Sequence, residues 1–165
     1  MNNTNSIGEY GILLEKKFSI LQEISNYVVS TENITSIANL MLDLAINYTN
    51  SEKGSLMLVN EFGQLYIGAA RGIDIRFFSA YRENIGEGIS GTVAKQKIPV
   101  LVNDIDKDQR FKKWKRDRYN TKSFISCPVL YKKKLLGVLN INDKKDSLPF
   151  TDEEFTLIKI ISNQG

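Results

Sequence analysis

Two apolar stripes run along the N-terminal part of the chain, one formed by Leu14, Phe18, Leu21 and Val28 and the other by Ile20, Ile24 and Tyr27. Their spacings predict a helix over about residues 13–29, and residues 1–12 are expected to be disordered or a linker. A helix with two stripes has two faces to bury. Both faces could pack on the chain itself, or one could pair with a partner helix, and we expect a homodimer through Leu14, Leu21 and Val28.

A second helix and a β-hairpin are predicted downstream. The polar cluster Thr31-Glu32-Asn33 supplies N-cap residues, and apolar positions recur at helical spacing over residues 34–48. Residues 56–59 and 65–70 are apolar runs separated by turn residues at 60–63, a pattern typical of a hairpin. Because both runs are apolar at nearly every position, both faces of these strands are expected to be covered.

The C-terminal segment predicts a further helix. Thr151 has the position of an N-cap, and the acidic residues Asp152, Glu153 and Glu154 follow it where the helix dipole favours negative charge. Apolar residues at 155, 158 and 161 would form its buried face. We expect this helix to be truncated here and to continue as a signalling linker in a longer protein.

Length and composition favour one domain over residues 13–165. A chain of 165 residues with 42% hydrophobic content can bury one core but is short for two. No apolar run approaches the roughly 20 residues that span a bilayer, and the N-terminus lacks a signal-peptide pattern. We therefore expect a cytoplasmic protein without membrane contact. The single Cys127 rules out a disulfide within the chain, which fits a reducing compartment.

The chain contains no histidine. Ser-His-Asp and Cys-His catalysis and histidine-ligated haem are therefore excluded, as is any ordinary base that titrates near neutral pH. A carboxylate or lysine tuned by burial remains open to catalysis. The composition favours a protein that is not an enzyme.

An ordered series of motifs lies between Asn84 and Lys145: a glycine-rich segment at 84–94, an Ile-Pro segment at 98–104, Asp-Gln-Arg-Phe at 108–111, a segment at 119–129 that runs into a strand, and a last strand at 135–144. This series resembles a GAF domain, the small-molecule-sensing module of signalling proteins, and the resemblance extends more weakly from about Leu21 to Ile161. It implies an α+β fold with a mostly antiparallel sheet of five or six strands. The N- and C-terminal helices would lie on one face and a pocket-forming lobe on the other.

Residues 86–91 have the G-x-G-x-x-G spacing of a dinucleotide-binding fingerprint. No parallel-strand crossover surrounds the motif, and no acidic residue ends a strand about 20 residues later, so a Rossmann unit is not indicated. The glycines predict a tight turn that leads into a helix near Gly88. Its N–H groups could receive a carboxylate, a phosphate or a carbonyl oxygen, or the glycines could only form the turn.

The resemblance also implies a set of ligand-binding residues. Laying the pattern of the cyclic-nucleotide-binding GAF domains on this chain points to Ser55, Ile89, Ser90, Trp114, Asp117, Thr121 and Asn140. The chain departs from that subfamily, because Asn142 and Lys144 are separated by Asp143 and because one residue, not three, separates Phe150 from Asp152. The expected ligand is a cyclic nucleotide or another small anionic or heteroaromatic metabolite.

Other cofactors of the family are not expected. Relatives that carry bilin use a Cys commonly followed by His, whereas Cys127 precedes Pro128 within an apolar strand. We interpret it as a small buried side chain. Haem-binding relatives need an axial His, and methionine-sulfoxide-reductase relatives need several cysteines.

Basic residues alternate with Phe111, Trp114 and Tyr119 over residues 107–122, a pattern that also suits single-stranded nucleic acid. The whole chain carries a net charge of only +3, so we expect a solvated helix that covers the pocket and no nucleic-acid function. The run Lys132-Lys133-Lys134 is expected to form a hairpin turn.

These patterns together favour a sensory, regulatory domain. It would bind a small molecule and act through helices at a dimer interface on an output domain that this chain lacks. The alternative is a ligand-free module for dimerisation or protein interaction.

Overall fold

The computed structural model describes residues 3–30, 33–74, 76, 80–114 and 120–163, with the helix backbone alone over 3–10 and 27–30. Its helices are α1 (Asn3–Ser30), α2 (Ile34–Thr49), α3 (Gly88–Gln96) and α4 (Asp152–Ser162), with a 3-10 turn at Lys112–Trp114. Its strands are β1 (Ser51–Val59), β2 (Gln64–Arg71), β3 (Arg82–Asn84), β4 (Val100–Val102), β5 (Phe124–Tyr131) and β6 (Lys134–Lys144).

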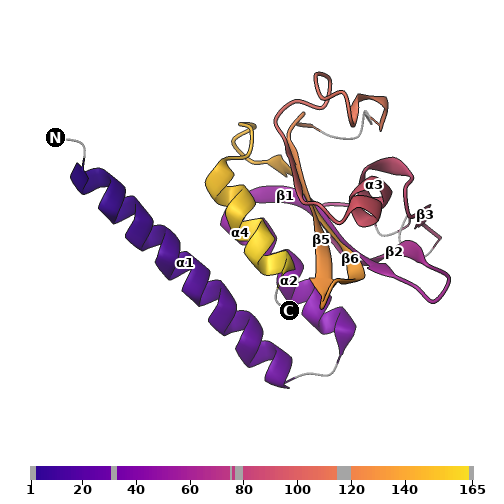
Figure 1. Cartoon of the computed structure of the whole chain (residues 1–165), viewed down its shortest axis with the longest axis horizontal. Coiled ribbons are helices and arrows are strands. Elements are labelled where there is room, and N and C mark those ends of the chain that lie inside the picture. Colours follow the sequence, from indigo (N-terminus) through magenta and orange to yellow (C-terminus); the bar gives the residue numbers. More distant parts are fainter. Residues whose placement is uncertain (1–2, 31–32, 75, 77–79, 115–119, 164–165) are drawn as a thin grey trace.

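The strands form one sheet of six in the order β3-β2-β1-β6-β5-β4, and every neighbouring pair is antiparallel. Helices α1, α2 and α4 lie on one side of this sheet, and α3 lies on the other (Figure 1). The predicted α+β architecture is confirmed. The predicted hairpin is β1–β2, and Lys132 and Lys133 form the turn between β5 and β6 with positive φ angles of 45° and 68°.

The sheet carries a separate core on each face because side chains alternate along its strands. On β6, Leu139 and Ile141 belong to the core beneath the helices, whereas Val138 belongs to the core beneath α3. Met57 of β1 and Phe124 of β5 join Val138. Both faces are therefore covered, which explains why the strands read as continuous apolar runs.

Helix α1 begins at Asn3 and not near residue 13, so the first turns expected as a linker are helical. An isolated glycine such as Gly11 costs a helix only about 1 kcal/mol and does not end it. The two stripes have different fates: Ile20 and Ile24 are buried against the domain, whereas Leu14 and Phe18 each remain 67% exposed. The Val28 side chain lies outside the described residues.

The predicted caps are confirmed. The Asn33 side chain accepts a hydrogen bond from the Thr35 N–H at the start of α2. At the start of α4, the Thr151 hydroxyl accepts from the Glu154 N–H, and the Thr151 N–H donates to the Glu154 carboxylate at 2.7 Å. This reciprocal pair satisfies two backbone donors that the helix itself cannot bond.

The segment 107–122 differs from the expected covering helix in its described part. The carboxylates of Asp104 and Asp108 accept from the N–H groups of Asp106 and Arg110, two residues further on. Such local bonds compete with helix formation. The described segment consequently holds only the 3-10 turn Lys112–Trp114.

Candidate functional site

A cavity of about 340 Å³ lies on the face of the sheet that carries α3. Strands β1, β2, β5 and β6 supply its floor, and the start of α3 and the connection before β3 supply its walls. The lining residues are Lys53, Ser55, Met57, Ile67, Gly72, Ile73, Asp74, Tyr81, Glu83, Ile89, Ser90, Phe124, Ile125, Asn140, Ile141 and Asn142. Half of these residues are apolar, and the other half carry polar or charged side chains.

A polar row crosses the middle of the floor. Asn140 of β6 lies opposite Ser55 of β1 and Ser126 of β5 in the strand register. The Asn140 Oδ1 accepts from the Ser126 hydroxyl at 2.7 Å and from the Ser90 hydroxyl of α3 at 3.5 Å, and its Nδ2 donates to the Ser55 Oγ at 3.4 Å. Asn140 therefore joins the sheet to α3 with both ends of its amide engaged.

The glycine-rich motif forms the turn into α3. Gly86 and Gly88 have φ angles of +97° and +62°, a region that favours glycine. The Glu83 Oε1 accepts from the Gly91 N–H at 2.7 Å, and its Oε2 accepts from the Tyr81 hydroxyl. A Cβ on Gly91 would lie 2.3 Å from the Asn84 carbonyl oxygen, so the motif permits the helix to approach the strand closely.

The next row of the floor contains Lys53, Asn142 and Phe124, which are register partners across β1, β6 and β5. The Lys53 Nζ lies 2.8 Å from the Asp143 Oδ2, and the Asp143 Oδ1 accepts from the N–H groups of Asn120 and Thr121. Burial alone would raise the pKa of Asp143, but the Lys53 ammonium and these two amides outweigh burial and hold its pKa below the usual value.

Four of the seven residues proposed from the sequence line the cavity: Ser55, Ile89, Ser90 and Asn140. Trp114 is half-buried against the core beneath α3, and Thr121 bonds to Asp143; neither is among the lining residues. Asp117 lies outside the described residues. A role of these residues in binding a ligand stays a prediction.

Sequence reasoning missed Lys53, Glu83 and Asn142. Asn142 follows Asn140 by two positions on a predicted strand, so the period of two could have placed both side chains on the same face. Lys53 lines the cavity because the strand register places it opposite Asn142, and Glu83 lines it because β3 packs beside α3. No local signal in the sequence gives either relationship.

Reactive groups and metal clusters are scarce in the part of the chain described. Cys127 is fully buried, and desolvation by burial raises the pKa of its thiol to about 12. Among the described residues, no group of three His, Cys, Asp or Glu side chains is arranged to hold a metal ion. Within the same residues, no helix has both the length and the apolar character needed to cross a membrane.

Among curated proteins, the chain is similar to the Nif-specific regulatory proteins of Herbaspirillum seropedicae, at 24% identity over 148 residues, and Rhizobium etli, at 23% over 149 residues. Each match covers 87% of this chain but only 27% and 26% of the respective relative. The chain therefore spans about a quarter of the length of these relatives.

Solved structures show the same fold. The GAF domain from an Acinetobacter phosphoenolpyruvate-protein phosphotransferase superposes with a TM-score of 0.74 at 21% identity, covering 99% of this chain and 91% of that one. Free methionine-R-sulfoxide reductase from Neisseria meningitidis gives a TM-score of 0.66 at 18% identity, with 88% and 86% covered. A family model described as GAF domain matches residues 31–165. This match takes in most of the chain, from α2 through the whole sheet to α4, and the chain belongs to the GAF domain family.

Proposed function

We propose that this domain is a sensory, regulatory module that binds a small molecule in the cavity between the sheet and α3. The main observation in support of ligand binding is the cavity itself. Its volume of about 340 Å³ lies within the range of about 300–1,000 Å³ that small-molecule sites occupy. The curated relatives are regulatory proteins by name, which supports a regulatory role. A small heteroaromatic metabolite, including a cyclic nucleotide, is the proposed class of ligand.

The sheet offers a direct route from this cavity to the helices. Along β6, Asn140, Ile141 and Asn142 are all among the lining residues, and Ile141 is also buried in the core that contains Ile158 and Ile161 of α4. Helix α4 in turn contacts α1, where the Lys16 Nζ lies 3.3 Å from a Glu153 carboxylate oxygen. A ligand that prefers one position of β6 would therefore bias the arrangement of α4 and α1.

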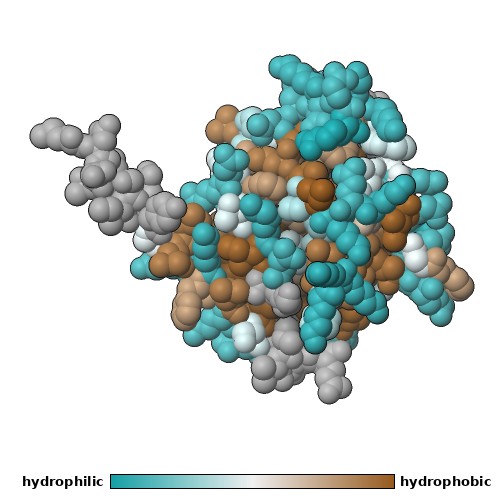
Figure 2. Space-filling model, viewed as in Figure 1, coloured by the Kyte–Doolittle hydropathy of each residue, from teal (hydrophilic) through white to brown (hydrophobic). Residues whose placement is uncertain are grey.

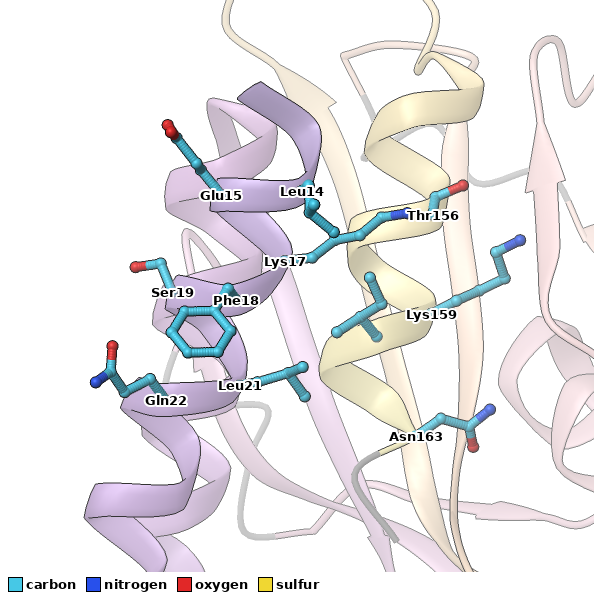
Figure 3. Close-up of a pocket in the computed structure, with 11 residues that line it drawn as sticks. Leu14, Glu15, Lys17, Phe18, Ser19, Leu21, Gln22, Thr156, Lys159 and Asn163 are labelled. Atoms are coloured by element: carbon cyan, nitrogen blue, oxygen red, sulfur yellow. The ribbon is translucent and has the colours of Figure 1, made fainter. Parts of the chain in front are cut away.

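The signal would be transmitted through an interface between α1 and a second copy of the chain. The exposed apolar residues of α1 line an open groove with α4, and the labelled side chains Leu14, Phe18 and Leu21 extend from α1 along it (Figure 3). Hydrophobic side chains also gather along the described part of α1 in the space-filling view (Figure 2). The spacing of four and three residues between these positions is the spacing of a helix-pairing seam. We propose that this surface forms the dimer interface and passes the signal to an output domain elsewhere in the parent protein.

A ligand-free dimerisation module is the second candidate. The exposed face of α1 supports it, because that face does not depend on whether the cavity is filled. An enzyme is not proposed. The sole cysteine is buried with its thiol protonated, and the sequence has no histidine to act as a base.

Two measurements test ligand binding. Native mass spectrometry of gently purified protein should show a mass above that of the polypeptide, with the denatured protein as control. A metabolite screen by thermal shift should find a compound that raises the melting temperature, because a ligand at a hundredfold excess over Kd stabilises the folded state by about 2.7 kcal/mol. No retained mass and no shift in the screen would favour the ligand-free module.

Light scattering at micromolar concentration tests the dimer. The unmodified protein should have the mass of two chains, and Leu21→Lys should reduce it to one, because a charge is costly to desolvate in an apolar seam. Leu21 is 44% exposed, so the change should leave the fold intact. Leu148→Lys is the matched control, since Leu148 is 60% exposed outside α1. A monomeric unmodified protein would refute the proposed interface.

A further inference from the structure

The charged groups around the cavity are already engaged. Lys53, Asp74 and Glu83 are the charged residues among its described lining. Lys53 pairs with Asp143 at 2.8 Å, and Asp74 accepts from the Arg76 guanidinium at 2.9 Å. Lys53 and Asp74 are thus each paired with an opposite charge, whereas the Glu83 carboxylate bonds to the neutral Gly91 N–H and Tyr81 hydroxyl. This balance opposes a ligand with a negative charge.

Glu83 also occupies the place where an anionic ligand would meet α3. Its carboxylate accepts the Gly91 N–H at 2.7 Å, within the first turn of the helix. A Cβ on Gly88 would lie 2.7 Å from the same Glu83 Oε1, so the carboxylate sits directly against the helix backbone. The favourable position for negative charge at a helix start is consequently taken by the protein itself.

Asn142 differs from these charged groups, because its side chain has a polar atom that no described residue bonds. Its side chain lines the cavity and is only 8% exposed, and its Nδ2 has no hydrogen-bond partner among the described residues. Its neighbour Asn140, by contrast, bonds at both ends of the amide. A buried donor left unpaired is destabilising, so an acceptor from a ligand would be favourable beside Asn142.

The lining also supplies apolar surface from both the sheet and α3. Met57 and Phe124 of the sheet belong to the core beneath α3, and Ile89 of α3 packs against that core from the helix side. We infer that the cavity binds an uncharged molecule with an apolar body, whose carbonyl oxygen or ring nitrogen accepts a hydrogen bond from the Asn142 Nδ2. The inference rests on the proposed function and narrows its ligand to neutral heterocycles and amides, which leaves out the anionic cyclic nucleotides named there.

Two pairs of probes test the charge preference. Nicotinamide and nicotinate have the same ring but differ in an amide against a carboxylate, and uracil and orotate differ by one carboxylate. Each is titrated into the full chain at pH 7 while the side-chain amide signals are followed by NMR. The neutral member of each pair should bind at least tenfold more tightly and should shift the Asn142 amide signal. Equal or tighter binding of the carboxylates would overturn the inference while leaving the sensor function intact.

Two substitutions test the donor. Asn142→Leu should weaken nicotinamide and uracil binding at least tenfold without lowering the melting temperature of the ligand-free protein, because it replaces a donor that has no partner among the described residues with an apolar group. Asn142→Asp keeps the shape but removes the donor, and it should weaken nicotinamide binding at least tenfold. Unchanged binding in both variants, or no response of the unmodified protein to any of the four probes, would overturn the inference. The native mass measurement separately decides whether the cavity holds any molecule.

Discussion

The carboxylate of Asp143 is expected to be a large single contributor to stability near the cavity. Its side chain is 1% exposed and lies 2.8 Å from the Lys53 ammonium. It also accepts from the N–H groups of Asn120 and Thr121 at 3.0 and 2.9 Å. Asp143→Ala would remove the counter-charge of Lys53 and the acceptor for both amides together.

The size of the effect follows from the burial of the two partners. Removing one member of a fully buried ion pair costs about 3–5 kcal/mol. Lys53 keeps 23% of its side chain exposed, so water can solvate part of its charge, and we expect about 3 kcal/mol. At about 2–4 °C per kcal/mol for a domain of this size, Asp143→Ala should lower the melting temperature by about 6–12 °C. Asp143→Asn keeps an acceptor oxygen and should cost about 1–2 kcal/mol.

Urea unfolding at pH 7, followed by circular dichroism, measures these differences. Glu153→Ala is the control, because Glu153 pairs with Lys16 on the surface and such pairs contribute less than about 1 kcal/mol. An Asp143→Ala variant as stable as this control would refute the reasoning. The pKa of Asp143 is lowered in the folded state, so its contribution is present at neutral pH and is lost as the pH falls below about 4. The stabilities of the unmodified protein and Asp143→Asn should therefore converge in acid.

Two further substitutions have matched controls elsewhere in the chain. Glu154→Ala should lower the free energy of unfolding by about 2–4 kcal/mol in urea titration, because it removes the carboxylate that accepts from the Thr151 N–H and the 3.0 Å ion pair with the buried Lys144. Glu153→Ala should cost less than about 1 kcal/mol. Gly91→Ala should lower the melting temperature, because the new Cβ would lie 2.3 Å from the Asn84 carbonyl oxygen. Gly11→Ala is its control: a Cβ there would meet no atom within 4 Å, and the change should stabilise α1 by about 0.4–1 kcal/mol. Equal effects within either pair would contradict the corresponding prediction.

Local signals were sufficient to predict much of the fold. The cap at Thr151 and the turn at Lys132 and Lys133 depend on residues within a few positions of each other, and the structure confirms them. The sequence shows that both stripes of α1 are apolar, so it predicts that at least one of them packs on the domain. Packing of the stripe with Ile20 and Ile24 was one of two possible outcomes. The sequence does not indicate which stripe the domain buries, since that choice depends on the helices and sheet around it.

The cavity could be predicted only in part for the same reason. Ser55, Ser90 and Asn140 follow from a family pattern tied to secondary structure, whereas Glu83 acts by reaching the backbone of α3 from a short neighbouring strand. Thr121 shows the limit of that transfer. Its position in the chain fits the pattern, but its N–H and hydroxyl both point to Asp143, which has a left-handed φ of 56° at the end of β6.

The same contacts suggest how a formed cavity would be compatible with the proposed response to a ligand. The start of α3 is held by Glu83 and by the Ser90 bond to Asn140, so the helix does not depend on ligand for its position. The free energy of ligand binding would therefore not be reduced by a cost of ordering α3. The bond between Ser90 and Asn140 is the longest in its network at 3.5 Å, whereas the Ser126 bond to the same oxygen is 2.7 Å. A ligand between the sheet and α3 would disturb the weaker bond first, and the change in Asn140 would pass through β6 to the helices that pack on Leu139 and Ile141.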